Sequence, residues 1–447
     1  MLYKIKAVLS DAEHRHTAIN AAIALTIRVL GAGMAFLFNI VIARQLGAEQ
    51  AGYFFLGLAL TMMLAGIARL GFDNTVLRFT SADADNGYTV KAILNFSLKY
   101  VLPVAFIFTV ITYAFAPWLA DNVFNKPGLT DTLQLIAPAI IGLSIVFLVA
   151  MSLQARHKLV VSIPCQNIAH FMLCGAAVII FSADSASTAA LYLSLSLGVT
   201  SSFFYWLSIK NLNNNGEKPD PQKLWHSARP NWVIIMMNQS VQWSAPIIIG
   251  VFLVAEQVAF FSVAQRIAML TSFILMAVNL VVAPKFSAFH AKGDDVGIRK
   301  TALFSVRLLV LSALPIVLFM LVFPDFLMSL FGNEFKQGAV ILQILVLGQA
   351  VNVVTGSVGF LLMMSGHERD MRLVTLISGF GVLISVPIFT KLFGAVGAAT
   401  AATRRKRRGR RLAPRGTRCP GNQGRRCRAA LVAPGQRRRP RAGGSPA

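Results

Sequence analysis

Charged residues, and acidic residues above all, are scarce in this 447-residue chain. Only 13% of the residues are Asp, Glu, Lys or Arg, 55% are hydrophobic, and the mean hydropathy is +0.63. Soluble globular domains carry roughly 25% charged residues, and disordered chains lack apolar residues. The composition excludes both classes, and the long apolar runs that recur along the chain predict a polytopic membrane protein.

Cysteine is also rare. Cys165 and Cys174 lie in apolar surroundings, and Cys419 and Cys427 lie near the C-terminus. Their spacing matches no zinc site or disulfide framework. The sequence also lacks a glycine-rich phosphate loop, a nucleophile elbow and paired carboxylates, so we expect no enzyme, no metal and no cofactor.

The basic excess is concentrated at the C-terminus. The net charge is +24, yet residues 404–447 contain 16 Lys and Arg and no Asp or Glu, which leaves +8 for residues 1–403. One interpretation is a basic tail that binds anionic lipid or nucleic acid. The other is a frameshift, because out-of-frame GC-rich codons produce Arg, Gly, Pro and Ala. We favour the frameshift, which predicts a disordered tail and no nucleic-acid partner.

Apolar runs of about 20 residues, long enough to cross a bilayer as helices, define eleven predicted spans. A twelfth begins at Gly394 and is disrupted at Arg404. Predicted loops on the N-terminal side contain 18 Lys and Arg against four on the other side, which places the N-terminus in the cytoplasm. The spans are 21–43, 53–68, 93–115, 133–153, 161–181, 189–209, 232–253, 258–282, 302–323, 340–363 and 373–390.

The two halves of the chain repeat. The segment AEQAGYF at residues 48–54 returns as AEQVAFF at 255–261, which is 207 residues later, and further pairs follow at nearly the same offset. We therefore predict an all-α polytopic fold of two six-helix lobes related by a pseudo-two-fold axis. The predicted regions are a cytoplasmic arm 1–20, a first lobe 21–209, a cytoplasmic linker 210–230, a second lobe 231–403 with an incomplete last helix, and a tail 404–447.

The Lys, Arg, Asp and Glu residues inside the predicted spans are all Lys or Arg. They are Arg28, Lys99, Arg266 and Arg307. Charges within the membrane are costly and usually line a cavity, so an all-cationic set favours an anionic substrate such as a pyrophosphate. Lys99 and Arg307 lie near span ends, where their side chains could instead extend to the membrane surface.

Two further groups of residues are candidates. Polar residues within spans predict a cavity lining, although helix packing would explain them equally well. Near the end of the second span, Arg69, Asp73 and Arg78 form a cluster that could be a gate or a substrate access point, or could contain a local Arg78–Asp73 ion pair. The predicted lining residues are Asn39, Asn238, Gln242, Gln265, Gln349 and Asn352.

Several motifs resemble those of the bacterial polysaccharide (O-antigen type) flippase family. They are IARQLGAEQAGY at 42–53, GFDNTVLRF at 71–79, FSVAQRIA at 261–268, LFGNEFKQGA at 330–339 and SGHE at 365–368. The resemblance covers residues 17–402; the basic C-terminus departs from it. It implies the multidrug/oligosaccharidyl-lipid/polysaccharide exporter superfamily, whose members have two six-helix lobes and work by alternating access.

The resemblance also implies a substrate. In this family it is an oligosaccharide on polyprenyl pyrophosphate, moved from the cytoplasmic to the periplasmic leaflet of the bacterial inner membrane, and cationic cavity residues bind its headgroup. The role carries over to Arg28, Arg78, Arg266 and Lys285, and more weakly to Lys99 and Arg307. Expected partners are membrane lipids, a polysaccharide polymerase and glycosyltransferases. A multidrug exporter and a peptidoglycan-precursor flippase remain alternatives.

Overall fold

The chain is built from helices. The computed structural model describes residues 12–82, 87–210, 212, 220–276, 278, 282, 295–355 and 368–412. Within these ranges every regular element is a helix and none is a strand. Many of the helices are long and apolar, which confirms the predicted all-α polytopic fold.

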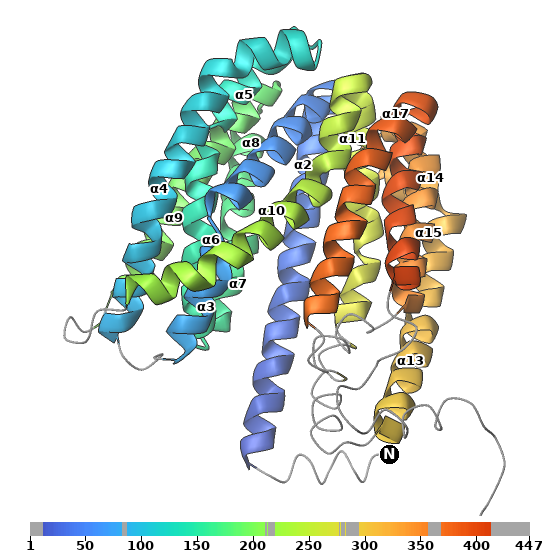
Figure 1. Cartoon of the computed structure of the whole chain (residues 1–447). Helices are drawn as coiled ribbons and strands as arrows, with labels where there is room; N and C mark the ends of the chain where they lie inside the picture. The colour runs from blue at the N-terminus through green and yellow to red at the C-terminus, as the bar shows by residue number, and fades with distance from the viewer. Residues whose placement is uncertain are drawn as a thin grey trace, which may run out of the picture.

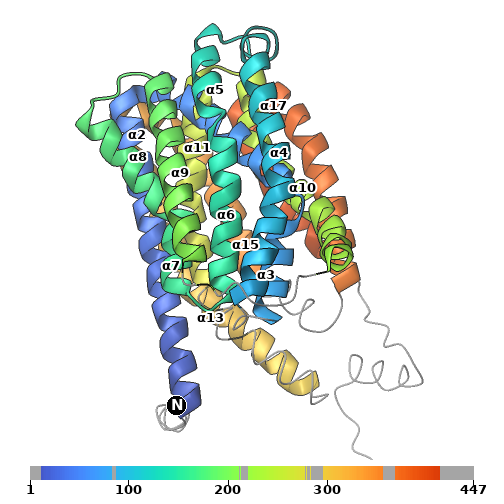
Figure 2. The same ribbon diagram turned by 90° about the vertical axis from the view of Figure 1, so that its left-hand side faces the viewer.

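The first half of the chain forms the bundle on the left of Figure 1. Figure 2 views this bundle from its outer side, where α4, α6 and α9 stand next to one another. Its elements are α2 (Ala12–Ala68), α3 (Phe72–Ala82), α4 (Gly87–Trp118), a π-helix (Leu119–Val123), a 3₁₀ turn (Pro127–Leu129), α5 (Thr130–Ile136), α6 (Ala139–Ala155), α7 (Leu159–Asn167), α8 (Ala169–Ile180) and α9 (Ala186–Ile209).

The second half forms the bundle on the right of Figure 1, and its first helix, α10, crosses over to the first half. The elements are α10 (Pro221–Phe252), α11 (Ala255–Met269), α13 (Asp295–Val322), α14 (Pro324–Ser329), a 3₁₀ helix (Asn333–Gly338), α15 (Ala339–Thr355) and α17 (Glu368–Leu412).

Two glycines divide the longest helices. Gly47 interrupts α2 with φ 72°, and Gly394 interrupts α17 with φ 63°. Only glycine adopts this left-handed backbone without strain, so each helix changes direction there and continues as a second segment. Figure 1 shows α2 rising to this turn and then descending toward α3. We call the end of the molecule at Gly47 the Gly47 end, and the opposite end, where α2 ends and α10 begins, the linker end.

The helices agree with the predicted spans, with two differences in count. Seven helices in the described ranges are long and apolar enough to cross a membrane, or up to nine if two pairs bent by 42° each count as one span. The first difference is that α2 contains two of the predicted spans. The second is α10, which is not among the seven and carries polar residues such as Asn238 and Gln242 in its middle.

Helix α17 extends into the region 404–447 that the sequence assigns to a basic tail. This helix continues to Leu412, so it includes residues 404–412. The physical reason is that Arg and Lys are good helix formers, and a run of them can extend a helix that is already nucleated. Residues 413–447 lie outside the described part of the chain.

The outer surface of the bundles is apolar. On α4, Phe106, Ile107 and Val110 are about half exposed, and Leu311 on α13 is 74% exposed. Small and apolar side chains fill the contacts between helices, as at Ala51, Phe54 and Phe261. An apolar exterior over a packed interior is what a lipid environment requires, because lipid tails solvate apolar side chains as well as the core does.

Candidate substrate cavity

Two of the predicted cations, one from each half, line the same cavity. Arg28 on the first segment of α2 and Arg266 on α11 both border a space of about 430 Å³. The first half contributes further lining from α6 and α7, and the second half contributes residues from Met269 to Met276. The cavity therefore lies between the halves, where transporter architecture places a substrate pathway.

The guanidinium groups of these two arginines have only weak partners. Arg28 Nη1 lies 3.5 Å from the sulfur of Met276, and the Arg266 Cζ lies 5.1 Å from the centre of the Phe55 ring. Among the described residues, neither arginine forms an ion pair, and no Asp or Glu borders the cavity. Two half-buried positive charges without a compensating carboxylate have the charge and the hydrogen-bond donors that an anionic ligand requires.

Amide side chains complete this cavity. Asn39 is 1% exposed, its Nδ2 donates to the Ala35 carbonyl, and its Oδ1 has no partner although it is buried. Gln154, Gln166 and Asn167 also line the space, and the sequence analysis missed them. Gln166 and Asn167 are two consecutive amides within the apolar stretch 161–181, and this pattern could have indicated a polar cavity lining.

A second cavity of about 330 Å³ lies among the helices of the second half. Four predicted polar residues line it: Asn238 and Gln242 on α10, Gln265 on α11 and Gln349 on α15. Asn352 does not border the space, but its Nδ2 donates to Gln349 Oε1 at 3.4 Å. Four of the six predicted lining residues thus border this cavity, and Asn39 borders the first one.

The remaining predicted cations lie elsewhere. Arg78 on α3, Lys99 on α4 and Arg307 on α13 are exposed and border neither cavity. The Cζ of Arg78 lies 5.8 Å from the ring centre of its neighbour Phe79. Lys285 lies outside the described residues. Among the described cations of the predicted set, the structure therefore brings together only Arg28 and Arg266.

The predicted gate cluster forms a different ion pair from the one considered. Asp73 accepts from Arg69 Nε at 2.9 Å, so its partner is Arg69 and not Arg78. The Arg69 guanidinium lies 4.3 Å from the Phe147 ring centre, and its side chain is only 5% exposed. Burial explains the choice, because Arg78 points to the surface while Arg69 needs a buried partner.

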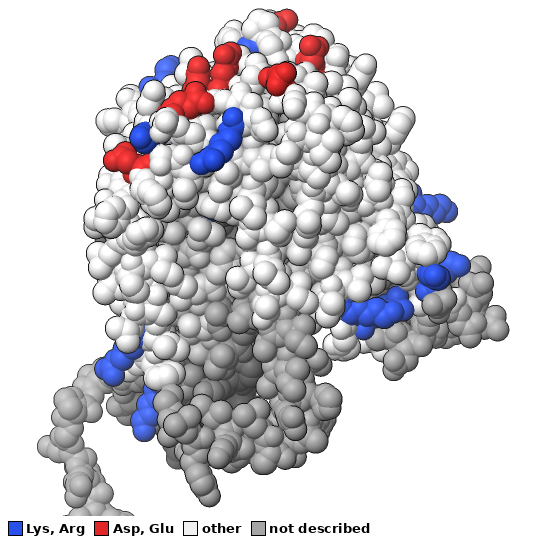
Figure 3. Space-filling view, turned by 180° about the vertical axis from the view of Figure 1, so that it is seen from behind, with Lys and Arg blue, Asp and Glu red and all other residues white. Residues whose placement is uncertain are grey.

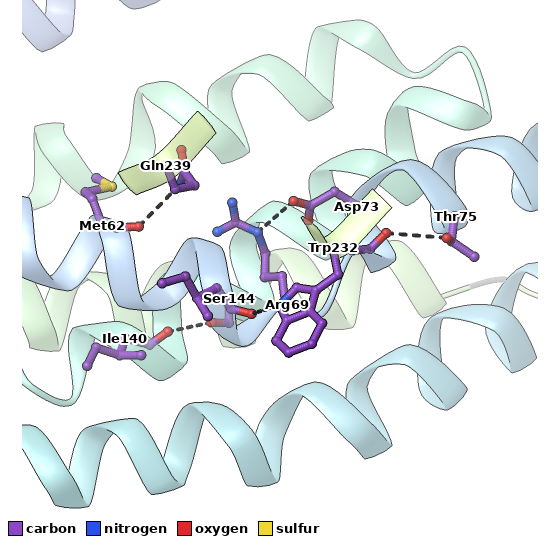
Figure 4. A network of polar contacts seen from close by, with 10 residues as sticks. Met62, Arg69, Asp73, Thr75, Ile140, Ser144, Trp232 and Gln239 are labelled. Carbon is purple, nitrogen blue, oxygen red and sulfur yellow. Dashed lines mark hydrogen bonds and ion pairs between the residues drawn. The ribbon is translucent and has the colours of Figure 1, made fainter. Parts of the chain in front are cut away.

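Helix α10 crosses the first half beside this ion pair (Figure 4). Trp232 Nε1 donates to the Ile67 carbonyl at 3.0 Å, and Gln239 Nε2 donates to the Met62 carbonyl at 3.3 Å. Both carbonyls belong to the descending segment of α2. The second half is thus anchored to the first at the linker end through α10.

At the Gly47 end, two side chains bind backbone of the opposite half. Glu334 Oε1 accepts from the Ala48 N–H at 2.9 Å, at the start of the second segment of α2. Lys126 Nζ donates to the Gly250 carbonyl at 2.5 Å, in the last turn of α10. A carboxylate at a helix N-terminus and an ammonium at a C-terminus are both favourable. We call these two contacts the Gly47-end latches.

Lys126 is strongly held. Its side chain is buried, and its Nζ also donates to the Phe124 carbonyl at 3.0 Å. Burial lowers the pKa of its ammonium group, and the nearby Glu256 carboxylate partly opposes that shift. Neither Lys126 nor Glu334 was predicted from the sequence to have a role.

Comparison with known proteins decides the family. The sequence matches the family described as "Polysaccharide biosynthesis protein" over residues 18–290. The chain belongs to this family. Residues 235–389 also match the family described as MatE. A Haloferax volcanii protein named "Probable low-salt glycan biosynthesis flippase Agl15" is 26% identical over 381 residues, which covers 83% of this chain and 77% of that protein.

Solved structures show the same fold. An inward-facing multidrug resistance MATE transporter of the MOP superfamily aligns with a TM-score of 0.67 and 14% identity over 91% of this chain and 98% of its own. The lipid II flippase MurJ, in an inward closed conformation, aligns with a TM-score of 0.67 and 13% identity over 87% and 86%. The family suggested by the sequence motifs is confirmed by the match over residues 18–290, and the solved structures show that this membrane protein has the fold of these transporters.

Proposed function

We propose that the protein flips an oligosaccharide linked to polyprenyl pyrophosphate from the cytoplasmic to the periplasmic leaflet of a bacterial inner membrane, for O-antigen, capsule or exopolysaccharide synthesis. The observation that carries the proposal is the meeting of Arg28 and Arg266 in one cavity between the halves. Guanidinium groups bind phosphate oxygens through paired hydrogen bonds, so two of them suit a pyrophosphate better than a single phosphate.

The charge distribution supports an N-terminus in the cytoplasm. In Figure 3 the visible Asp and Glu side chains gather at the top, with Lys and Arg among them, whereas the coloured side chains lower down are all Lys and Arg, and an uncharged band lies between. Cytoplasmic loops carry the excess of Lys and Arg, so the linker end would face the cytoplasm. The latches that join the halves at the Gly47 end are consistent with access from the cytoplasmic side.

The cavity argues against a multidrug exporter of the same fold. A pump for cations would need a carboxylate to hold its ion or its drug, and the described lining residues of the Arg28 cavity include none. A peptidoglycan-precursor flippase would also bind pyrophosphate, so the experiment must separate these two substrates.

The test is a deletion of the gene, followed by separate measurement of lipid-linked oligosaccharide in the inner leaflet and polysaccharide at the cell surface. We expect accumulation inside and loss outside, both reversed by the wild-type chain and not by an Arg28→Gln/Arg266→Gln variant. Loss of peptidoglycan precursor export instead would identify the alternative flippase. Unchanged pools with increased drug sensitivity would identify an exporter.

The proposal also defines the neighbouring steps. Glycosyltransferases would have to supply the lipid-linked repeat unit on the cytoplasmic side, and a polymerase would consume it on the other side. A strain that lacks the flippase should therefore hold completed repeat units and not shorter precursors, because assembly precedes flipping. Gel or mass analysis of the accumulated lipid would show which is present.

A further inference from the structure

The cavity of the second half is chemically different from the Arg28 cavity. Its polar lining consists of the amides Asn238, Gln242, Gln265 and Gln349 together with Ser244, and the described lining residues include no charged side chain. The rest of its wall is aliphatic, as at Val382 and Val386 of α17. Neutral donors and acceptors beside apolar walls suit a ligand with many hydroxyl groups and C–H surfaces, which is a sugar.

Three of these amides are available for a ligand. Within the described part of the chain, the side chains of Asn238, Gln242 and Gln265 make no hydrogen bond to other protein groups. Gln349 is different, because its Oε1 accepts from Ser272 and Asn352, each at 3.4 Å. Unpaired amides in a membrane interior are costly unless a ligand or water satisfies them. Helix packing, the alternative explanation of these residues, would have paired them.

The two cavities adjoin along α11. Met269 borders both of them, while the neighbours Gln265 and Arg266 each border one. Consecutive residues on a helix point about 100° apart, since a turn has about 3.6 residues, so α11 presents an amide to one cavity and a cation to the other. A molecule with a phosphate next to a sugar could therefore occupy both sides of this wall.

We propose that the cavity lined by Asn238, Gln242 and Gln265 is a sugar compartment that binds part of the oligosaccharide while Arg28 and Arg266 bind the pyrophosphate. This inference rests on the proposed function and deepens it. With about 330 Å³, the compartment lies at the lower end of the range for small-molecule pockets, about 300–1,000 Å³. It has room for a terminal portion of a repeat unit and would make the flippase selective for the sugar, not only for the carrier lipid.

The experiment compares two probes on the purified full-length protein in nanodiscs. One is undecaprenyl pyrophosphate without sugar; the other is the lipid-linked oligosaccharide extracted from the deletion strain. The test variant is Gln242→Met/Gln265→Met, which preserves side-chain length and removes only amides that have no hydrogen-bond partner among the described residues. Gln222→Met, at the exposed start of α10, is the matched control.

We expect the test variant to bind the sugar-bearing probe about tenfold more weakly than wild type, since each lost hydrogen bond contributes about 0.5–1.5 kcal/mol. Its affinity for the sugar-free probe should stay unchanged, whereas Arg28→Gln/Arg266→Gln should weaken both probes. Equal weakening of both probes by the test variant, or no effect on either, would overturn the sugar compartment. Failure of the wild type to bind any lipid pyrophosphate would instead overturn the proposed function.

Discussion

At Arg28 and Arg266, the demands of folding and of binding oppose each other. A half-buried guanidinium without a carboxylate costs free energy in a membrane protein, and the sulfur of Met276 and the ring of Phe55 offset only part of it. Such a cost is tolerated where an anion supplies the missing charge. Under the proposed function Arg28 and Arg266 bind the substrate, and they are therefore expected to destabilise the empty protein.

This conflict between stability and binding leads to the first prediction. Arg266→Met should weaken binding of undecaprenyl pyrophosphate at least tenfold, because a hydrogen bond to a charged group contributes about 1.5–3 kcal/mol. The same variant should unfold at a higher temperature without ligand, since methionine has no charge to desolvate. Thermal unfolding and equilibrium binding measure the two effects. Arg78→Met, which removes an exposed cation, should change neither; a less stable Arg266→Met with normal binding would contradict the prediction.

For Arg69 and Asp73 we expect the opposite effect on stability, namely that removing one charge destabilises the protein. Both side chains are largely buried and bind each other at 2.9 Å, so removing one leaves an unpaired charge. We predict that Asp73→Asn lowers the stability by up to about 3–5 kcal/mol, the range for breaking a buried ion pair. The double variant Arg69→Met/Asp73→Leu should recover most of that loss. A double-mutant cycle on thermal unfolding measures it, and additive losses would show that the two residues act independently.

At the scale of the elements, one close approach between the halves depends on a residue without a side chain. A Cβ at Gly52 in the second segment of α2 would lie 2.0 Å from the Ala255 carbonyl at the start of α11. These helices carry the repeated AEQ motif, so the repeat brings its two copies into contact. Helices that pack through glycine approach more closely than larger residues allow.

Gly52→Ala should therefore separate α2 from α11 or strain their backbones. We expect a loss of stability of about 1–3 kcal/mol, as for other overpacked contacts, measured by thermal unfolding. Gly198 in α9 has no atom within 4 Å of its Cβ position, so Gly198→Ala is the matched control. It should stabilise the protein by up to about 1 kcal/mol, because alanine is the better helix former. Equal effects of the two variants would mean that α2 and α11 tolerate separation.

At the scale of the whole molecule, the latches at the Gly47 end are positioned to control which side is open. Lys126 of the first half binds the Gly250 carbonyl of the second, and Glu334 of the second half binds the Ala48 N–H of the first. Under the proposed alternating access, these contacts would have to break when the halves separate at this end. They therefore stabilise the observed arrangement over the alternative one.

Lys126→Met/Glu334→Gln should shift the protein toward a state that is open at the Gly47 end. Two helix-terminus contacts of about 0.3–1 kcal/mol each would change the population ratio by about 3- to 30-fold. Spin labels at Asn122→Cys and Gln337→Cys, both exposed on opposite halves, would report a longer distance in a background without native cysteines. Lys391→Met, which removes an exposed cation of α17, should leave the distance unchanged. No shift in the latch variant would show that other contacts hold this end closed.

The sequence by itself determined the class of the protein and most of its helices. Apolar length and Lys/Arg asymmetry depend on local composition, so the spans could be read without knowledge of packing. The turns at Gly47 and Gly394 carry their own glycine signal. The resemblance of the motifs also identified the family, and the absence of carboxylates in the spans favoured an anionic substrate before any geometry was known.

Only the tertiary structure decided which candidates meet. Arg28 and Arg266 share a cavity while Lys99 and Arg307 face outward, and nothing in the hydropathy of their spans distinguishes them. The pairing of Asp73 with Arg69 and the contacts of the latches were likewise invisible. The physical reason is that a span forms from neighbouring residues, whereas a cavity forms from helix rotations set by packing between opposite halves. The amides of the second half illustrate both contributions. The sequence predicted that they line a cavity, but only the structure showed that this cavity is distinct from the one that contains Arg28 and Arg266.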